Sequence, residues 1–238
     1  MRIITDVPKR VLCVFAHPDD ADIGAGGTIA KWSAAGATVT LVVAALGDKG
    51  TLDPMMDPAA LVAERASELK SASAELGVSE VIKLGAGDGE IVNDSALRET
   101  LVAIVRRIRP DVVMSHDPGA IYFGSTYFNH RDHRELGFAV LDAVFPASHL
   151  PHYFPNAGAP HRVPLVLLSG TMEATAAVDI SEYLDSKQAA VRSHQTQVGA
   201  RAAQVVASID STARALGRSV GLGAAEVFRE LRNEMGAR

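Results

Sequence analysis

Short apolar runs alternate with amphipathic stretches along most of the chain. The runs are rich in Val, Ile and Leu and nearly continuous in hydrophobicity, as in strands that a parallel sheet buries on both faces. We expect strands over residues 10–16 (RVLCVFA), 38–46 (TVTLVVAAL), 80–85 (EVIKLG), 111–116 (DVVMSH) and 163–170 (VPLVLLSG).

Helical periodicity fills the gaps between the first four runs. Helices are expected over residues 24–35, 58–76 and 94–108, with a fourth from about residue 129 to 144. In the second helix, alanine and leucine recur at helical spacing, a proline stands near the start and a glycine follows the end. The C-terminal third, from residue 181 to the end, is also expected to be helical.

This βαβα order predicts an α/β fold. We expect a Rossmann-like, mostly parallel sheet with helices on both faces, plus a C-terminal helical segment. A chain of 238 residues fits one such unit, so residues 1–238 are expected to form a single domain. The loops at 47–57 and 116–129 are long and follow strands, so they should converge at the carboxyl edge of the sheet, where such folds bind ligands.

Residues 145–164 interrupt this pattern with several prolines, three histidines and little periodicity. We interpret the segment as an irregular loop at the surface. The spacing of His149, His152 and His161 fits no compact metal site, so we expect them to be loop histidines.

Composition narrows the class of protein. A formal charge of −5 gives no general attraction to nucleic acid or to anionic lipid, so we expect neither as a partner. The N-terminal apolar stretch is short and ends in charges, and no run reaches the roughly 18 residues of a membrane span. The one cysteine, Cys13, lies in the first strand, which predicts a buried core thiol and a reducing compartment. We therefore expect a cytoplasmic protein.

The segment at 16–27, AHPDDADIGAGG, gathers a histidine and carboxylates at the end of the first strand. A nucleotide-binding loop is a weak explanation, because the G-x-G-x-x-G spacing is absent and the aspartates would repel a pyrophosphate. Helix capping accounts well for Asp22, since a carboxylate stabilises the free N–H groups of a helix start. Capping does not require His17.

A metal site explains the segment together with a second motif, NHRDH at 129–133. His130 and His133 are three residues apart at the start of a predicted helix, hence on adjacent turns of one face. With His17 and Asp20, one of them completes a His₂Asp set, which suits a catalytic zinc with an open fourth position. Asp19 adjoins a ligand and could accept a proton from the attacking water, while the remaining histidine could steady an oxyanion.

AHPDDADIGAGG and NHRDH together resemble the LmbE/PIG-L-type deacetylases, whose pattern is A-H-P-D-D-E followed by glycines and, over a hundred residues later, H-x-D-H. The resemblance continues through ERASELKSASAELGV, GDGEI, RPDVVMSHDP and VRSHQTQ, so it covers most of the chain. It implies a Rossmann-like fold, a metal-dependent amidase activity on N-acetylglucosamine-type substrates, and a homo-oligomer.

The resemblance also implies a role for individual residues. It makes His17, Asp20 and His133 ligands of one Zn²⁺ per chain, a set that Fe²⁺ can also occupy. It makes Asp19 the general base and His130 the group that stabilises the tetrahedral intermediate, kept charged and oriented by Asp132. Two further residues, Arg65 and Asp88, match positions that grip sugar hydroxyls; otherwise Arg65 is a solvated helix residue and Asp88 a turn residue.

Several positions depart from the family pattern or lack an assigned role. Ala21 replaces the usual glutamate, so a supporting contact around the metal is expected to be missing. Phe128 stands where some members carry a tyrosine that assists the oxyanion. His194, in SHQTQ, is expected to be structural rather than part of the active site. His116 ends a strand at the ligand edge, and we expect it to support the site or anchor a loop.

These observations predict a zinc-dependent N-deacetylase that releases acetate from an N-acetylated aminosugar, a small-molecule partner. Two alternatives stay open at this point: an amidase acting on a thiol conjugate or an acylated antibiotic precursor, and a sugar-binding protein of the same fold with impaired catalysis.

Overall fold

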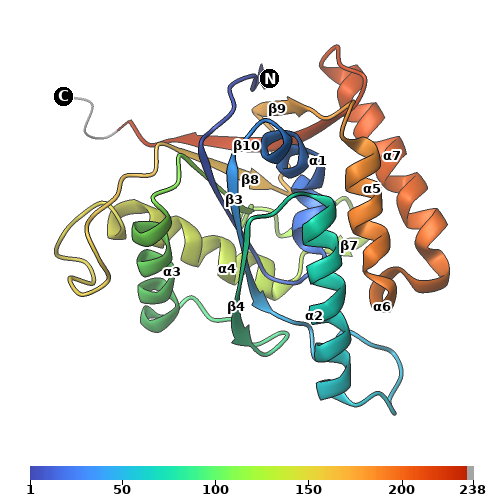
Figure 1. Ribbon diagram of the computed structural model, residues 1–238, viewed down its shortest axis with the longest axis horizontal. Helices are drawn as coiled ribbons and strands as arrows, with labels where there is room; N and C mark the ends of the chain where they lie inside the picture. The colour runs from blue at the N-terminus through green and yellow to red at the C-terminus, as the bar shows by residue number, and fades with distance from the viewer. Residues whose placement is uncertain (235–238) are drawn as a thin grey trace.

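The computed structural model describes residues 1–234 and is built around an eight-stranded sheet (Figure 1). Five parallel strands form its main part, in the order β8-β5-β2-β3-β4. They are β2 (Arg10–Phe15), β3 (Thr38–Ala45), β4 (Glu80–Ala86), β5 (Val112–His116) and β8 (Leu165–Ser169). All five coincide with the predicted strands, and the mostly parallel sheet is confirmed.

Three further strands extend the sheet beyond β8. β10 (Ala225–Arg232) runs antiparallel between β8 and β9 (Ala176–Asp179), and the short β1 (Arg2–Ile3) pairs with β9. The prediction that the C-terminal third is helical to its end is therefore wrong at 225–232; its final residues, 235–238, lie outside the described part. The sequence AEVFRELR contains good helix formers, but pairing with two neighbouring strands overrides that local preference.

Helices cover both faces of the sheet, as predicted. One face carries α1 (Asp20–Ala34), α2 (Pro58–Glu75), α5 (Leu184–Ser193) and the long α7 (Ala202–Ser219), with α5 and α7 side by side in Figure 1. The other face carries α3 (Ser95–Ile108) and α4 (Arg131–Asp142). Short elements complete the chain: α6 (Gln195–Val198), η1 (Ala143–Ala147), η2 (Gly199–Arg201) and the hairpin of β6 (Tyr122–Phe123) and β7 (Tyr127–Phe128).

The alternation of side chains along β2 divides the core into two layers. Cys13 and Phe15 pack into the layer under α1, which includes Trp32, whereas Leu12 and Val14 pack into the layer under α3 and α4. Cys13 is fully buried, and burial raises the pKa of its thiol. The prediction of a core thiol is confirmed.

A buried arginine on α3 organises the irregular segment 145–164. Arg106 donates hydrogen bonds to the backbone carbonyls of Ala147, Ser148, Leu150, Tyr153, Phe154 and Gly158. His161 is half-buried and its ring contacts the carbonyl of Pro110 at 2.9 Å. Within residues 1–234, none of the three histidines of this segment belongs to a metal-ligating cluster, in line with the prediction of loop histidines.

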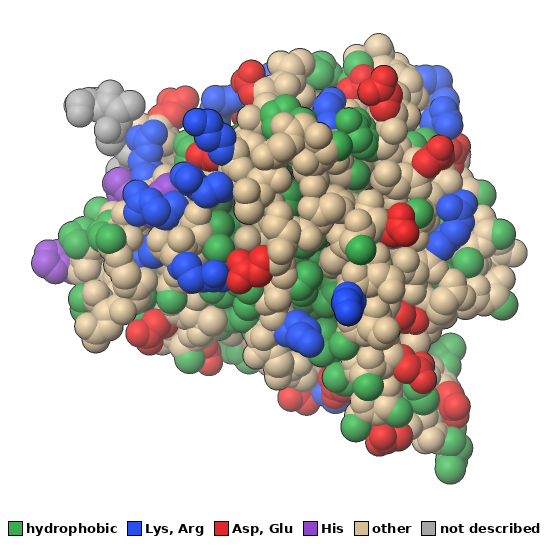
Figure 2. Space-filling view, in the orientation of Figure 1, with side chains coloured by type: hydrophobic (Ala, Val, Ile, Leu, Met, Phe, Trp, Pro, Cys, Tyr) green, Lys and Arg blue, Asp and Glu red, His purple; other side chains and the backbone are tan. Residues whose placement is uncertain are grey.

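Charged side chains are distributed over the surface. Lys and Arg side chains gather at the upper left of the face shown in Figure 2. Among the exposed ion pairs, Arg10 lies 3.9 Å from Asp111 and Arg107, in the last turn of α3, lies 3.0 Å from Glu80. Among the helices formed by residues 1–234, none has both the length and the apolar content needed to cross a membrane.

Candidate active site

The site lies where the strand order reverses direction. From β2 the sheet continues through β3 and β4 on one side and through β5 and β8 on the other, which opens a crevice at the carboxyl ends of β2 and β5. The HPDD segment leaves β2, and His116 ends β5. The loops after β3 and β4 and the start of α4 meet them there, so the predicted convergence at this edge is confirmed.

The three predicted ligands, His17, Asp20 and His133, form one compact cluster. Asp20 Oδ1 lies 3.2 Å from His133 Nε2, and Asp20 Oδ2 lies 3.4 Å from His17 Nδ1. The backbone N–H of His17 also donates to Asp20 Oδ2, at 2.7 Å. Burial would raise the pKa of Asp20, but the neighbouring His133 and His116 hold it well below its usual range. The donor atoms of His17, Asp20 and His133 all lie within 4.8 Å of one another, as a single metal ion requires.

Two neighbours hold this cluster in place. Asn129 Oδ1 lies 3.0 Å from His133 Nδ1, and the same amide donates to the carbonyl of Ala120. This arrangement places a proton on Nδ1 of His133 and leaves its Nε2 free for a ligand. His116 stacks on His133 with ring centroids 4.0 Å apart, and its Nε2 accepts a hydrogen bond from the backbone of Ala16. Burial lowers the pKa of His116 to about 4, although the Asp20 carboxylate beside it opposes this shift.

Asn129 is a residue that the sequence interpretation missed. Its signal was the first letter of NHRDH, four residues before His133 and therefore close to it at the start of the helix. The interpretation of His116 as a supporting residue agrees with its place beside Asp20, at 3.3 Å.

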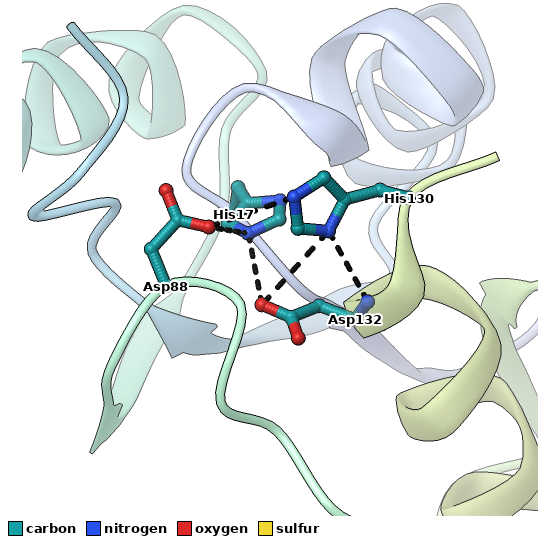
Figure 3. Close-up of side chains that lie close together, drawn as sticks. All are labelled: His17, Asp88, His130 and Asp132. Atoms are coloured by element: carbon teal, nitrogen blue, oxygen red, sulfur yellow. Dashed lines mark hydrogen bonds and ion pairs between the residues drawn. The ribbon is translucent and has the colours of Figure 1, made fainter. Parts of the chain in front are cut away.

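The other ring nitrogen of His17 faces a second cluster (Figure 3). His17 Nε2 lies 3.1 Å from Asp88 Oδ1 and 3.4 Å from Asp132 Oδ2. Burial opposes a proton on His17, but its bonds to Asp20 and Asp88 outweigh that effect and raise its pKa to about 10. Asp88 is therefore more than a turn residue, because its carboxylate points into the site.

Asp132 and His130 lie together but without a strong bond between their side chains. The closest approach of the Asp132 carboxylate to His130 is 3.9 Å, at Nδ1, and this nitrogen accepts from the backbone N–H of Asp132. The fully buried Asp132 carboxylate instead accepts from the backbone of Gly89 and Ile91. Burial, followed by the charge of His17, lowers the pKa of His130, so its neutral form is favoured.

Asp19 has a partner of its own. Arg65 Nη2 lies 3.1 Å from Asp19 Oδ1, and Arg65 Nη1 donates to the carbonyl of Gly47 at 3.3 Å. Arg65 is only 3% exposed, so the interpretation as a solvated helix residue is wrong. The close approach of the Arg65 guanidinium to the backbone at position 47 requires glycine there. The φ of this residue is +72°, and an added Cβ would lie on the guanidinium.

The capping prediction for Asp22 is wrong, because this carboxylate lies inside the first turn of α1 and bonds to a distant histidine. Asp22 Oδ2 lies 2.5 Å from His194 Nε2, and both side chains are buried. Burial raises the pKa of Asp22. Burial opposes a proton on His194, but the bond to Asp22 and the negative charge of Asp22 together outweigh it and raise the pKa of His194 too. His194 joins neither metal-ligating cluster among the described residues, as expected of a structural residue.

A small cavity opens beside the first cluster. Its volume is about 170 Å³, and its lining includes Asp20 and His133. Phe123 and Tyr127, from the β6–β7 hairpin, also line it. A reacting group placed in this cavity would touch the candidate metal ligands directly.

The geometry agrees with what known proteins show. A model of the PIG-L family, described as GlcNAc-PI de-N-acetylase, matches residues 12–144, a stretch that contains all eight predicted site residues. The chain belongs to the PIG-L family. It is therefore an N-deacetylase, and the predicted family and class of reaction are confirmed.

Individual PIG-L relatives extend the similarity over most of the chain. This chain is 36% identical over 193 residues to a diacetylchitobiose deacetylase of Thermococcus kodakarensis, and the match covers 79% of this chain and 70% of that protein. It is 32% identical over 236 residues to a 1D-myo-inositol 2-acetamido-2-deoxy-alpha-D-glucopyranoside deacetylase of Actinosynnema mirum, covering 80% and 81%. The N,N'-diacetylchitobiose deacetylase of Pyrococcus horikoshii superimposes with a TM-score of 0.86 at 29% identity, over 96% of this chain and 88% of that one, which confirms the fold.

Proposed function

We propose that this protein is a zinc-dependent hydrolase that removes the N-acetyl group from an N-acetylglucosamine-containing small molecule and releases acetate. The observation that carries the proposal is the meeting of His17, Asp20 and His133 within 4.8 Å, with Asp19 directly before Asp20 in the sequence. The similarity to deacetylases of diacetylchitobiose and of an inositol glycoside of N-acetylglucosamine supports the substrate class.

The three residues suit a zinc ion. Two imidazole nitrogens and a carboxylate oxygen are a donor set typical of catalytic zinc, and Asn129 directs His133 Nε2 toward Asp20. Bound there, zinc would polarise the acetamide carbonyl and lower the pKa of a water molecule. Fe²⁺ would fit the same donors, so the metal needs direct identification.

Asp19 is the proposed general base. It lies next to the ligand Asp20 in sequence but is absent from both metal-ligating clusters of the described residues, so its oxygens remain available for a proton. Arg65 bonds to Asp19 Oδ1 and leaves Oδ2 to accept the proton of the attacking water. The same carboxyl group then protonates the amine as it leaves, and Arg65 serves to position Asp19.

His130 and Asp88 complete the site from the other side of His17. His130 Nδ1 accepts a backbone hydrogen bond, so the neutral ring carries its proton on Nε2 and can donate it as a hydrogen bond to the developing oxyanion. Asp132 accepts hydrogen bonds from the backbone of Gly89 and Ile91, and its carboxylate faces His17. Its proposed role is therefore to hold this loop and His17 in place, without keeping His130 charged. Asp88 is the proposed acceptor for a sugar hydroxyl.

Acetate release tests the proposal. The metal-loaded protein would be incubated with N-acetylglucosamine, diacetylchitobiose and an inositol glycoside of N-acetylglucosamine, with a thiol-conjugate amide as a contrasting substrate. We expect acetate and a free amine in equal amounts from at least one of the sugars. Release from the thiol conjugate alone would contradict the proposed substrate class, and no release from any of them would contradict the proposed function.

A further inference from the structure

A second cavity adjoins the one beside the metal-ligating cluster. It has a volume of about 390 Å³ and lies between α7, the start of β10 and the first turn of α1. Its walls include the apolar side chains of Ile209, Leu216 and Val227, and the hydroxyl of Thr212 lies on its α7 side. None of the residues assigned to catalysis or metal binding lines it.

The two cavities share part of their walls. Ile23, Gly24 and Gly170 line both. Gly24 follows the ligand Asp20 by four residues of α1, just over one turn, which is about 6 Å along the helix axis. Gly170 follows β8 at the same edge of the sheet. Two of the three shared residues are glycines, which contribute no side chain to the shared wall.

The size of the first cavity indicates that a substrate extends beyond it. At about 170 Å³ it is smaller than the roughly 300–1,000 Å³ of most small-molecule sites. The second cavity, at about 390 Å³, falls within that range. A molecule with its acetamide at the cluster would therefore reach past Gly24 and Gly170.

The chemistry of the second cavity favours a neutral group. Its charged lining residues, Lys187 and Glu226, form a buried ion pair with Nζ and Oε1 2.5 Å apart. Lys187 also donates to the carbonyl of Ile23, and the Glu226 carboxylate accepts from the backbone of Gly27 and Thr28. Since each ion is already paired and hydrogen-bonded, neither offers a free charge to a ligand. The part of the lining that remains available to a ligand consists of apolar side chains and hydroxyl groups.

We propose that the second cavity is an aglycone subsite, which binds a neutral, largely apolar group attached to the N-acetylglucosamine unit. The inference rests on the proposed function for the position of the sugar. It predicts that such a group strengthens binding, because burial of two methylene groups already corresponds to about tenfold in affinity.

Kinetic comparison of two substrates tests the subsite. We would measure kcat/KM for free N-acetylglucosamine and for its octyl β-glycoside, and take the ratio of the two. Wild-type protein is expected to prefer the octyl glycoside by about tenfold or more. Thr212→Trp, at an exposed helix position that lines the cavity, should fill it and bring the ratio close to one. Ala207→Trp, on the opposite side of α7 and equally exposed, is the matched control and should keep the wild-type ratio.

A binding measurement separates failure of the subsite from failure of the proposed function. Calorimetry would compare the octyl glycoside with the free sugar on wild-type and Thr212→Trp protein. An octyl-dependent gain in affinity that Thr212→Trp removes would support the subsite, even without acetate release from any substrate. Equal affinity for both ligands in wild-type protein, or a gain that survives Thr212→Trp, would overturn it.

Discussion

The Asp19 carboxylate lies 3.1 Å from the Arg65 guanidinium, while its neighbour Asp20 faces three histidines. Two adjacent aspartates thus have separate partners, although one peptide bond joins them. This separation is the physical basis for the separate tasks that we propose for them: Asp20 as a metal ligand and Asp19 as the group that moves a proton.

Replacement of Asp19 by asparagine should abolish most activity without loss of the metal. The amide keeps the size of the side chain but cannot accept the proton, and a general base contributes about 10²–10⁴-fold to the rate. The measurement is kcat for acetate release together with the metal content of the same sample. Asp20→Asn is the comparison and should lose metal as well as activity. Loss of metal from Asp19→Asn to the same degree would make Asp19 a ligand instead of a base.

Replacement of Asn129 by alanine should weaken metal binding. The amide oxygen 3.0 Å from His133 Nδ1 orients the ring, and loss of such a partner costs about 10–100-fold in metal affinity. Competition with a chromophoric zinc chelator would measure the dissociation constant. The exposed neighbour Phe128, changed to leucine, provides a control that should bind zinc as the wild type does. Unchanged affinity in Asn129→Ala would remove Asn129 from the support of the site.

Replacement of His194 by alanine should destabilise the fold. The change leaves the Asp22 carboxylate buried without its partner, and breaking a buried pair in this way costs about 3–5 kcal/mol. Urea denaturation would measure the free energy of unfolding for the single variants and for the double variant Asp22→Ala, His194→Ala. The double variant should lose less than the sum of the two singles, and strict additivity would contradict a direct coupling.

The Asp22–His194 pair should also make stability depend on pH. The folded state raises the pKa of His194 above 6.5, so it binds the proton more tightly than the unfolded chain does. The stabilisation is therefore complete below about pH 6.5 and is lost as the pH rises through the raised pKa. The difference in unfolding free energy between wild type and the double variant should shrink from pH 6 to pH 9. A difference that grows over this range would contradict the account.

Replacement of Arg106 by alanine should loosen the segment 145–164. Six backbone carbonyls lose their donor, and we expect a loss of about 3 kcal/mol in stability together with faster proteolysis of this segment. Limited proteolysis followed by mass spectrometry locates the first cuts. Arg107→Ala, at the exposed neighbouring position, is the control and should be cut at the wild-type rate. The metal content should be unchanged in both, because Arg106 bonds only to this segment.

The sequence predicted the main strands and helices well because each is specified by its own local pattern of apolar residues. β10 escaped prediction because its residues are good helix formers and only pairing with β8 and β9 makes them a strand. The metal-ligating residues could be predicted because HPDD and NHRDH are compact motifs at strand and helix ends. The bonds from Arg65 to Asp19 and from His194 to Asp22 could not, since they join residues 46 and 172 positions apart. Such pairings depend on how α2 and α5 pack against α1, which periodicity does not specify.

The most direct test of the central claim is the metal content of the protein purified without added metal or chelator, measured beside a His133→Ala variant. If His17, Asp20 and His133 form one metal site, wild-type protein should contain about one zinc or iron ion per chain, and the variant should contain almost none. Equal metal content in the two proteins, or no metal in either after incubation with Zn²⁺, would contradict the claim.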